Sequence, residues 1–421
     1  MASVCFYFQV HQPYRLRNYT IFDSDSYYFD EQKNSQICRK VAEKCYMPAN
    51  HLMLELIKKH DGKFRISYSI TGVMLEQLQR YAPWVLDSFK ELAQTGCVEF
   101  LAETYYHSLS SLYCEDEFIE QVMLHKQTIE RLFGQTPRVF RNTELIYNNY
   151  IAGMVSRMGG FDAMITEGVD RILGYRSPNF VYKAACGGNM KLLLKNYRLS
   201  DDIAFRFSNR GWSQWPLCAP KFAGWVNEVN GCGFLVNLFM DYETFGEHQW
   251  MDTGIFNFLR YLPDEILKHP DNDFKTPSEA VTAYDDYDVV DVPHTISWAD
   301  IERDTSAWQG NAMQHNALVE LYKLEKMVKN TEDENIISDW RKLQTSDHFY
   351  YMCTKWFADG DVHKYFNPYE SPYDSYINFM NVLDNLSTRC QDVMCEKRNV
   401  LENFTRSHIA AEHKLVTLER I

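Results

Sequence analysis

The sequence predicts an α/β protein in which a parallel (β/α) barrel is followed by a C-terminal helical unit. Over about the first 300 of the 421 residues, short β-rich runs alternate with longer amphipathic stretches, which is the pattern of parallel βαβ units. Beyond about residue 300, strand candidates become few and helical periodicity dominates. These observations divide the chain into a predicted barrel over 1–300, a helical bundle over 301–390 and a final helix or tail over 391–421.

The individual elements follow from hydrophobic periodicity. A run of about seven strands favours a closed barrel over an open, doubly wound sheet, which is the alternative. Strands are expected over 3–10, 64–70, 97–103, 138–144, 161–166, 203–208, 233–241 and 288–292. Helices are expected over 48–60, 82–95 and 115–133, and in the C-terminal part over 308–330, 333–358 and 373–389.

Charge and composition narrow the classes of function. Lys and Arg number 43 against 57 Asp and Glu, a formal net charge of −14, so neither a nucleic acid nor an anionic membrane is an expected partner. Aromatic residues make up 15% of the chain, which fits stacking on sugar rings as well as a Tyr-rich core. No signal peptide or membrane-spanning stretch is recognised. The 11 cysteines include no CxxC pair, which favours reduced thiols and a cytoplasmic location.

The first candidate site is the tripeptide His11-Gln12-Pro13, at the end of the first predicted strand. Pro13 ends the strand because proline cannot donate to the ladder. Parallel barrels carry their active sites at the carboxyl ends of the strands. His11 is therefore placed to hydrogen-bond a ligand, and a purely structural histidine is the alternative.

An acidic residue in apolar surroundings is the second candidate. Glu144 closes the predicted strand at 138–144, after the apolar Val139 and Phe140. A carboxylate in such surroundings is costly unless it is paired or protonated. Arg141 is a candidate partner, and an ion pair at the barrel rim is the alternative to a functional carboxylate.

The most specific pattern is a pair of acidic residues at the end of a hydrophobic strand. Asp241 ends the strand at 233–241 and Glu243 follows two residues later, so strand alternation places both on one face. Like charges this close raise the pKa of one of them, as a proton donor near neutral pH requires. Glycoside cleavage needs two carboxyl groups flanking the bond, and Glu144 with Asp241 is the expected pair. A solvated acidic loop is the alternative.

Five segments, in order, resemble the signature segments of glycoside hydrolase family 57. They are HQPYR at 11–15, FLAETYYHSL at 100–109, FRNTELIYNN at 140–149, MDYETFGEHQ at 240–249 and WQGNAMQHNALVELY at 308–322. LQTSDHFYYM at 343–352 then resembles the helical region of the family's α-amylase branch, and the similarity spans about residues 1–390. The resemblance implies an incomplete TIM-like (β/α)7 barrel with a helical bundle packed on it, and a retaining mechanism on α-glucans.

The resemblance also implies roles for individual residues. By position, Glu144 matches the family's nucleophile, Asp241 its general acid/base and His11 its sugar-contacting histidine. Further residues in or beside the matching segments are expected to bind substrate: Gln12, Glu103, His107, Glu243, His248, Trp308 and Asp347. For Glu103 and His107 a structural pairing is the alternative, and for Trp308 a place in the core. No metal and no other cofactor is expected.

The predicted function is an α-amylase-like, retaining glycoside hydrolase that cleaves α-1,4-glucans or maltooligosaccharides through a covalent glycosyl-enzyme. A 4-α-glucanotransferase or an α-glucan branching enzyme of the same family is the first alternative, because the acceptor decides between hydrolysis and transfer. A metal-dependent polysaccharide deacetylase or a non-catalytic glucan-binding protein is the second. Nothing in the sequence predicts the oligomeric state.

Overall fold

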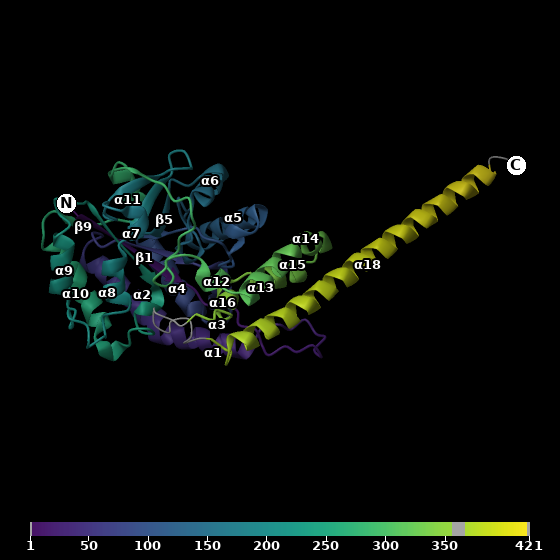
Figure 1. The fold of residues 1–421 in the computed structure, drawn as a ribbon, viewed down its shortest axis with the longest axis horizontal. Helices are drawn as coiled ribbons and strands as arrows, with labels where there is room; N and C mark the ends of the chain where they lie inside the picture. Colours follow the sequence, from purple (N-terminus) through teal and green to yellow (C-terminus); the bar gives the residue numbers. More distant parts are fainter. Residues whose placement is uncertain (1, 356–366, 419–421) are drawn as a thin grey trace.

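The computed structural model describes residues 2–355 and 367–418, with side chains as far as residue 399. It has a mixed α/β fold in which two five-stranded, largely parallel sheets lie next to each other and are covered by helices (Figure 1). This confirms the predicted α/β class. Within the described ranges, no helix has the length and apolar character needed to span a membrane.

The two sheets contain ten strands in all among the described residues. The strands are β1 (Ala2–Val10), β2 (Ile66–Ile70), β3 (Val98–Phe100), β4 (Val139–Arg141), β5 (Ala163–Glu167), β6 (Val181–Ala184), β7 (Lys191–Lys195), β8 (Leu235–Asp241), β9 (Asn272–Phe274) and β10 (Val289–Val290). The first sheet has the order β3-β2-β1-β8, with β9 pairing with β1, and the second has the order β10-β6-β7-β5-β4. Every pairing is parallel except that of β6 with β7.

Helices connect and cover the strands. They are α1 (Glu31–Val41), α2 (Met47–Lys59), α3 (Gly72–Tyr81), α4 (Pro83–Gln94), α5 (Glu115–Phe133), α6 (Asn149–Met158), α7 (Asp170–Leu173), α8 (Tyr197–Ala204), α9 (Ala219–Asn227), α10 (Ile255–Leu267) and α11 (Pro277–Ala283). The sequence predicted α5 to the residue, because its ends are chemically marked. Acidic residues fill its first turn, and Gly134 follows its end in a left-handed conformation (φ 68°).

Backbone hydrogen bonds join the two sheets along both edges. Just beyond β3, the Ala102 N–H donates to the Val139 carbonyl (3.0 Å), and the Arg141 N–H donates to the Ala102 carbonyl (2.8 Å). On the other side, the N–H of Asn196, directly after β7, donates to the carbonyl of Asn237 in β8 (2.9 Å). Seven parallel strands, β1, β2, β3, β4, β5, β7 and β8, therefore follow one another in a ring, and their carboxyl ends meet at one edge.

Apolar side chains from these strands fill the inside of the ring. The buried cluster there includes Cys5, Tyr7, Leu101, Val139, Ile165, Leu193 and Phe239. β1 is central in the first sheet and all nine of its residues are buried, which explains why it is a nearly continuous apolar run in the sequence.

The C-terminal part is helical, as predicted. It contains α12 (Ser306–Gln309), α13 (Ala312–Lys323), α14 (Glu325–Thr331), α15 (Glu334–Leu343), α16 (Ser346–Tyr350) and α18 (Pro372–Leu418). The first half of α18 packs against α13, α14 and α15, and Figure 1 shows the helix running on beyond them. Side chains of this part, such as Leu318, Trp340 and Phe379, share one hydrophobic core with Phe118 of α5 and Met154 of α6. Residues 356–358 of the predicted helix 333–358 and residues 419–421 of the predicted tail lie outside the described residues.

Some predicted strands differ from the observed ones. The strand expected over 203–208 is wrong, because Ile203 and Ala204 are the last two residues of α8. The first turn of this helix is capped by the Asn196 side chain, which accepts from the Leu199 N–H (3.1 Å). Leu199 and Ile203 are four residues apart and so share one face of that helix. β6, β7 and β9 were not predicted. The Leu192–Leu194 run within β7 illustrates the reason, since a short apolar run is compatible with strand and helix alike.

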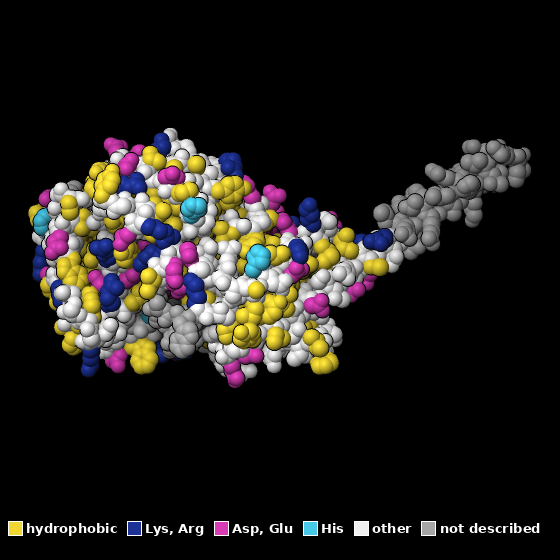
Figure 2. All heavy atoms as spheres, in the orientation of Figure 1, with side chains coloured by type: hydrophobic (Ala, Val, Ile, Leu, Met, Phe, Trp, Pro, Cys, Tyr) yellow, Lys and Arg dark blue, Asp and Glu magenta, His cyan; other side chains and the backbone are white. Residues whose placement is uncertain are grey.

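Acidic and basic side chains are interspersed over the body on the face shown in Figure 2. Among the described residues, buried ion pairs also occur, and they concentrate near the carboxyl edge of the strands. Buried charged groups of both signs therefore gather at that edge.

Candidate active site

A cleft with two lobes opens at the carboxyl edge of the ring of strands. The polar lobe, a hollow of about 580 Å³, is lined by Gln9, His11, Gln12, Pro13, Arg15, His107, Arg141, Glu144, Asp241, Glu243, His248, Trp298, Asp347 and Tyr351. The mixed lobe, about 750 Å³, is lined by Lys195, Asp201, Ala204, Phe205, Phe239, Met240, Asp241, Thr244, His248, Trp298, Ala299, Asp300, Arg303 and Tyr350. Asp241, His248 and Trp298 line both lobes, so the lobes adjoin each other.

The structure brings most of the predicted site residues together. Those that line the polar lobe are His11, Gln12, His107, Glu144, Asp241, Glu243, His248 and Asp347. They come from the ends of β1 and β8, from the segments that follow β3 and β4, and from α16. Convergence of polar side chains in one concave site is typical of an active site.

Glu144 lies in a tight turn directly after β4. Its backbone has φ 56° and that of Leu145 has φ 51°, both in the left-handed region that non-glycine residues rarely adopt. The Glu144 side chain is 4% exposed. Its Oε1 accepts from His107 Nε2 (3.0 Å) and from Ser346 Oγ (3.4 Å), and its Oε2 accepts from Trp298 Nε1 (2.6 Å). The turn thus presents a carboxylate held by donors from three separate segments.

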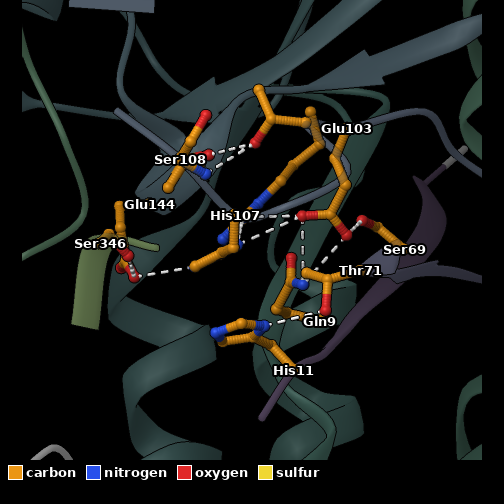
Figure 3. A network of polar contacts seen from close by, with 12 residues as sticks. Gln9, His11, Ser69, Thr71, Glu103, His107, Ser108, Glu144 and Ser346 are labelled. Carbon is orange, nitrogen blue, oxygen red and sulfur yellow. Dashed lines mark hydrogen bonds and ion pairs between the residues drawn. The ribbon is translucent and has the colours of Figure 1, made fainter. Parts of the chain in front are cut away.

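His107 lies between two carboxylates, as Figure 3 shows. Its Nδ1 is 3.3 Å from Glu103 Oε2 and its Nε2 is 3.0 Å from Glu144 Oε1. Burial lowers the pKa of His107, but the two hydrogen bonds outweigh burial and raise it to about 9. Carboxylates accept and do not donate, so His107 donates through both nitrogens and is positively charged at neutral pH.

Glu103 supports His107 from below the cleft. It is completely buried and accepts from Gln9 Nε2 (3.1 Å) and from the Ser69 hydroxyl (Figure 3). Arg141 Nη1 lies 3.5 Å from its Oε2. Burial raises the pKa of Glu103, but the His107 hydrogen bond and the charge of Arg141 lower it to about 2. Glu103 is therefore ionised. Its contacts are those of a structural pairing with His107, which was the alternative to a substrate contact.

His11 is stacked on His107, with ring centroids 4.0 Å apart. Burial and the charge of His107 lower the pKa of His11 to about 4, so His11 is neutral at pH 7. Its Nε2 is 3.0 Å from Asp347 Oδ2 and its Nδ1 is 2.9 Å from Thr71 Oγ1. Since a carboxylate only accepts, the proton lies on Nε2, and the Thr71 hydroxyl donates to Nδ1. The contact with Asp347 ties α16 to the end of β1.

One group of side chains could hold a cation by distance alone. His11, His107 and Asp347 each offer a ligand atom within 4.8 Å of one another. Metal ligation requires an unprotonated imidazole nitrogen, whereas both nitrogens of His107 bear protons that its two carboxylate partners accept. The hydrogen-bond pattern therefore does not fit a metal site unless His107 loses a proton and one of its partners.

Glu243 lies close to Asp241 but not for the reason the sequence suggested. β8 ends at Asp241, and Glu243 belongs to a short helical turn, Tyr242–Thr244, rather than to the same strand face. Glu243 is 4% exposed and accepts from the Tyr46 hydroxyl and, at 3.5 Å, from Gln12 Nε2. Burial and the charge of Asp241 raise its pKa to about 8. The raised pKa thus belongs to Glu243, whereas the proton donor expected from the sequence was Asp241.

Gly246 fixes the path of the loop that follows this pair. Its φ is 112°, and a Cβ at this position would lie 2.1 Å from the Lys44 carbonyl oxygen. Only glycine allows the loop to approach the segment around Lys44 so closely. This close approach brings Tyr46 to Glu243.

Apolar and charged groups share the mixed lobe. Phe205, 46% exposed, offers an aromatic surface, and Lys195 lies 3.2 Å from Asp201. Arg303 pairs with the buried Glu167 at 3.0 Å. Lys195 and Arg303 are thus engaged in ion pairs, while Phe205 remains an exposed apolar surface.

Two further findings differ from the sequence prediction. Trp308, predicted to contact substrate, is fully buried in the hydrophobic core, 6.3 Å from the Tyr350 ring, so the core alternative describes it. Trp298, which the sequence analysis did not select, lines both lobes and donates to Glu144. A tryptophan in a polar segment just after a short predicted strand, 288–292, was the available signal.

Comparison with known proteins agrees with this geometry. Residues 5–293 match the family model described as Glycosyl hydrolase family 57. A protein of Methanocaldococcus jannaschii named "Putative alpha-amylase" is 46% identical over 394 residues, which cover 90% of this chain and 83% of that protein.

Solved structures share the fold at low identity. A GH57-type branching enzyme from Pyrococcus horikoshii has a TM-score of 0.67 at 15% identity, covering 91% of this chain and 88% of that enzyme. A 4-alpha-glucanotransferase from Thermococcus litoralis has a TM-score of 0.65 at 14% identity, covering 83% of this chain but 56% of that longer enzyme. With the family model matching over more than half of its length, this chain belongs to glycosyl hydrolase family 57.

Proposed function

We propose that this protein is a retaining glycoside hydrolase of the α-amylase type that cleaves α-1,4-glucans or maltooligosaccharides. One observation carries the proposal: Glu144 and Asp241, from the ends of different strands, line the same lobe. Two carboxyl groups facing one site are what glycoside cleavage requires. The match to family 57 and the name of the M. jannaschii relative support the substrate class.

The environments of the carboxyl groups support their roles. The donors His107, Ser346 and Trp298 favour an ionised Glu144, as a nucleophile needs. Glu243, beside Asp241, keeps a proton near neutral pH because burial and the charge of Asp241 raise its pKa to about 8, so the two carboxyls titrate as a coupled pair that retains one proton. In the proposed reaction Asp241 gives a proton to the glycosidic oxygen, the bond from that oxygen to the anomeric carbon breaks, and Glu144 forms a bond to the anomeric carbon. Asp241 then takes a proton from water, which hydrolyses the glycosyl-enzyme.

The same lobe provides the groups that would bind the sugar hydroxyls. His11, Gln12, Glu243, His248 and Asp347 line it and are the proposed substrate contacts. Glu103 and His107 would act on the substrate mainly by fixing Glu144, because their side chains are engaged with each other and with Glu144.

The architecture proposed for the catalytic unit is an incomplete (β/α)7 barrel with a helical domain on one side. The ring of seven parallel strands and the hydrogen bonds that join the two sheets support the barrel. The core that the C-terminal helices share with α5 and α6 supports a packed helical domain. The proposed boundaries are 1–300, 301–390 and 391–421. All eleven cysteines are unpaired, which supports a cytoplasmic location.

Glucan transfer is the second candidate function. The Phe205 ring, 46% exposed in the lobe next to Asp241, is an apolar surface on which an acceptor sugar would stack. Such an acceptor would replace water in the second step and give a 4-α-glucanotransferase or branching activity.

Products of maltoheptaose test the proposal. We expect shorter maltooligosaccharides whose newly formed reducing ends are first α-anomers, read by proton NMR within minutes of mixing, with no effect of EDTA. Products longer than maltoheptaose would assign transfer. New β-anomers would exclude a retaining mechanism, and activity lost with EDTA would favour the metal-dependent alternative. Binding of maltoheptaose without any product would indicate a non-catalytic glucan-binding protein.

A further inference from the structure

Trp298 contacts Glu144 at two separate points. Its indole Nε1 donates to Glu144 Oε2 at 2.6 Å, and its backbone N–H donates to the Glu144 carbonyl at 3.1 Å. The backbone hydrogen bond holds the main chain of Glu144, whose φ is 56°, and the indole hydrogen bond holds the Glu144 carboxylate. One residue from a distant segment thus fixes both halves of Glu144.

The segment that carries Trp298 is itself anchored. Ile296 exchanges two backbone hydrogen bonds, each 2.9 Å, with Tyr147, which lies three residues after Glu144 in the chain. The Ser297 hydroxyl donates to the Asp304 carbonyl at 2.5 Å, which closes the segment into a compact loop. The position of the indole relative to Glu144 therefore does not depend on the indole contact alone.

Two buried cations lie near the indole ring. The Arg141 guanidinium carbon and Lys195 Nζ are each 5.2 Å from the ring of Trp298. Arg141 is 0% exposed and lines the polar lobe, while Lys195 is 5% exposed and lines the mixed lobe. Cations at this distance are attracted to the π electrons, and their field strengthens the N–H as a donor to a carboxylate.

The two cations also affect whether the Trp298 ring is available to stack on a sugar. An aromatic ring in a sugar cleft is ordinarily interpreted as a stacking platform. Here the ring already interacts with Arg141 and Lys195, and the polar edge of the indole is directed to Glu144. Within the described residues, Arg141 Nε and Nη2 have no hydrogen-bond partner. The polar contacts of its Nη1 are Glu103 Oε2 and His107 Nδ1, each at 3.5 Å, and its guanidinium also contacts the Trp298 ring.

We propose that Trp298, held by Arg141 and Lys195, is a positioning residue that orients the Glu144 carboxylate for attack, and that it is not a sugar-stacking platform. The inference rests on the proposed function of Glu144 as the nucleophile. It goes beyond that function because it assigns a role to a residue outside the signature segments.

Trp298→Phe separates the two roles, because phenylalanine keeps an aromatic ring and removes the N–H donor. With maltoheptaose as substrate, we expect kcat to fall about 10- to 100-fold, as for loss of a hydrogen bond to a charged group. We expect KM to change less than about threefold. The acid limb of the kcat/KM profile should move to higher pH, because the ionised form of Glu144 loses a donor.

The matched control is Trp340→Phe. The Trp340 indole also donates a buried hydrogen bond, to the Leu321 carbonyl at 2.9 Å, but it lies in the helical core. This variant should lower the melting temperature without moving the pH profile. A raised KM with unchanged kcat in Trp298→Phe would overturn the proposal in favour of stacking, and so would unchanged kinetics.

A spectroscopic measurement tests the contact without any substrate. In ¹⁵N-labelled protein, the Trp298 indole proton, assigned by its loss in Trp298→Phe, should resonate downfield of ordinary indoles. It should move upfield in Glu144→Gln while the Trp340 indole proton stays in place. An indole resonance that does not respond to Glu144→Gln would overturn the inference. Wild-type protein inactive on every α-glucan, with the resonance responding as expected, would instead contradict the proposed function and leave the positioning contact supported.

Discussion

The two carboxyl-bearing turns at the polar lobe are built in opposite ways. The turn after β4 surrounds Glu144 with donors, namely a charged imidazole, an indole and a hydroxyl. The turn after β8 instead sets Glu243 beside a second carboxyl, Asp241, and burial with that charge raises the pKa of Glu243 to about 8. Donors favour an ionised carboxylate, whereas crowding of carboxyls favours a retained proton. The contrast fits the proposed roles, in which the turn after β4 supplies the attacking carboxylate and the turn after β8 supplies the proton.

Removing the charge of Glu144 should have the largest effect. Glu144→Gln keeps the shape of the side chain and removes the nucleophile, so kcat on maltoheptaose should fall at least about 10⁴-fold. Binding of maltoheptaose, measured by calorimetry, should persist. Full activity in this variant would contradict the different roles proposed for the two turns.

Removing the proton donor should have the next largest effect. Asp241→Asn should lower kcat on maltooligosaccharides by about 10²- to 10⁴-fold. An aryl α-glucoside with an acidic phenol as leaving group should lose much less, because the phenolate departs without a proton. An equal loss on both substrates would show that Asp241 acts otherwise than as the acid.

The pH dependence of stability sharpens the comparison. The pKa values of Glu243 and His107 are raised from 4.5 and 6.5 to about 8 and about 9, so the folded protein retains protons that the unfolded chain releases. The stability due to Glu243 is therefore lost between about pH 4.5 and 8 and that due to His107 between about pH 6.5 and 9, so both losses act together between about pH 6.5 and 8. Calorimetry should show a melting temperature that decreases by a few degrees over this range. Glu243→Gln should flatten the decrease and leave the part due to His107. If Glu243→Gln leaves the slope of melting temperature against pH unchanged, the retained proton is not on Glu243.

The smallest catalytic effect is expected at Trp308. Because its side chain is fully buried in the core, Trp308→Phe should lower the free energy of unfolding by about 1–3 kcal/mol. Both kcat and KM on maltoheptaose should stay within about twofold of wild type. A rise of KM with unchanged kcat would instead indicate that Trp308 contacts the substrate.

The site residues that could be predicted from the sequence are those at the ends of strands. His11, Glu144 and Asp241 each follow an apolar run that reads as a strand, so the carboxyl-edge rule was enough to bring them together. The contacts of Trp298 were not predictable, since they depend on the pairing of Ile296 with Tyr147 in an irregular loop. No local periodicity encodes such a pairing.

Charge states were harder to predict than positions. His107 is positively charged because Glu103 and Glu144, 4 and 37 residues away in the chain, meet its two ring nitrogens. Its neighbour His11 is neutral because it stacks on that charge inside the protein. Two neighbouring histidines thus differ in charge for reasons that arise only from tertiary packing.

The most direct test of the central claim is to trap the glycosyl-enzyme. A 5-fluoro-α-glucosyl fluoride has a good leaving group, and its ring fluorine slows the breakdown of the intermediate. Incubation with it, followed by peptic digestion and mass spectrometry, should show one modified peptide carrying the sugar on Glu144. A sugar on Asp241 or Glu243, or no covalent adduct in an enzyme that the reagent inactivates, would contradict the account.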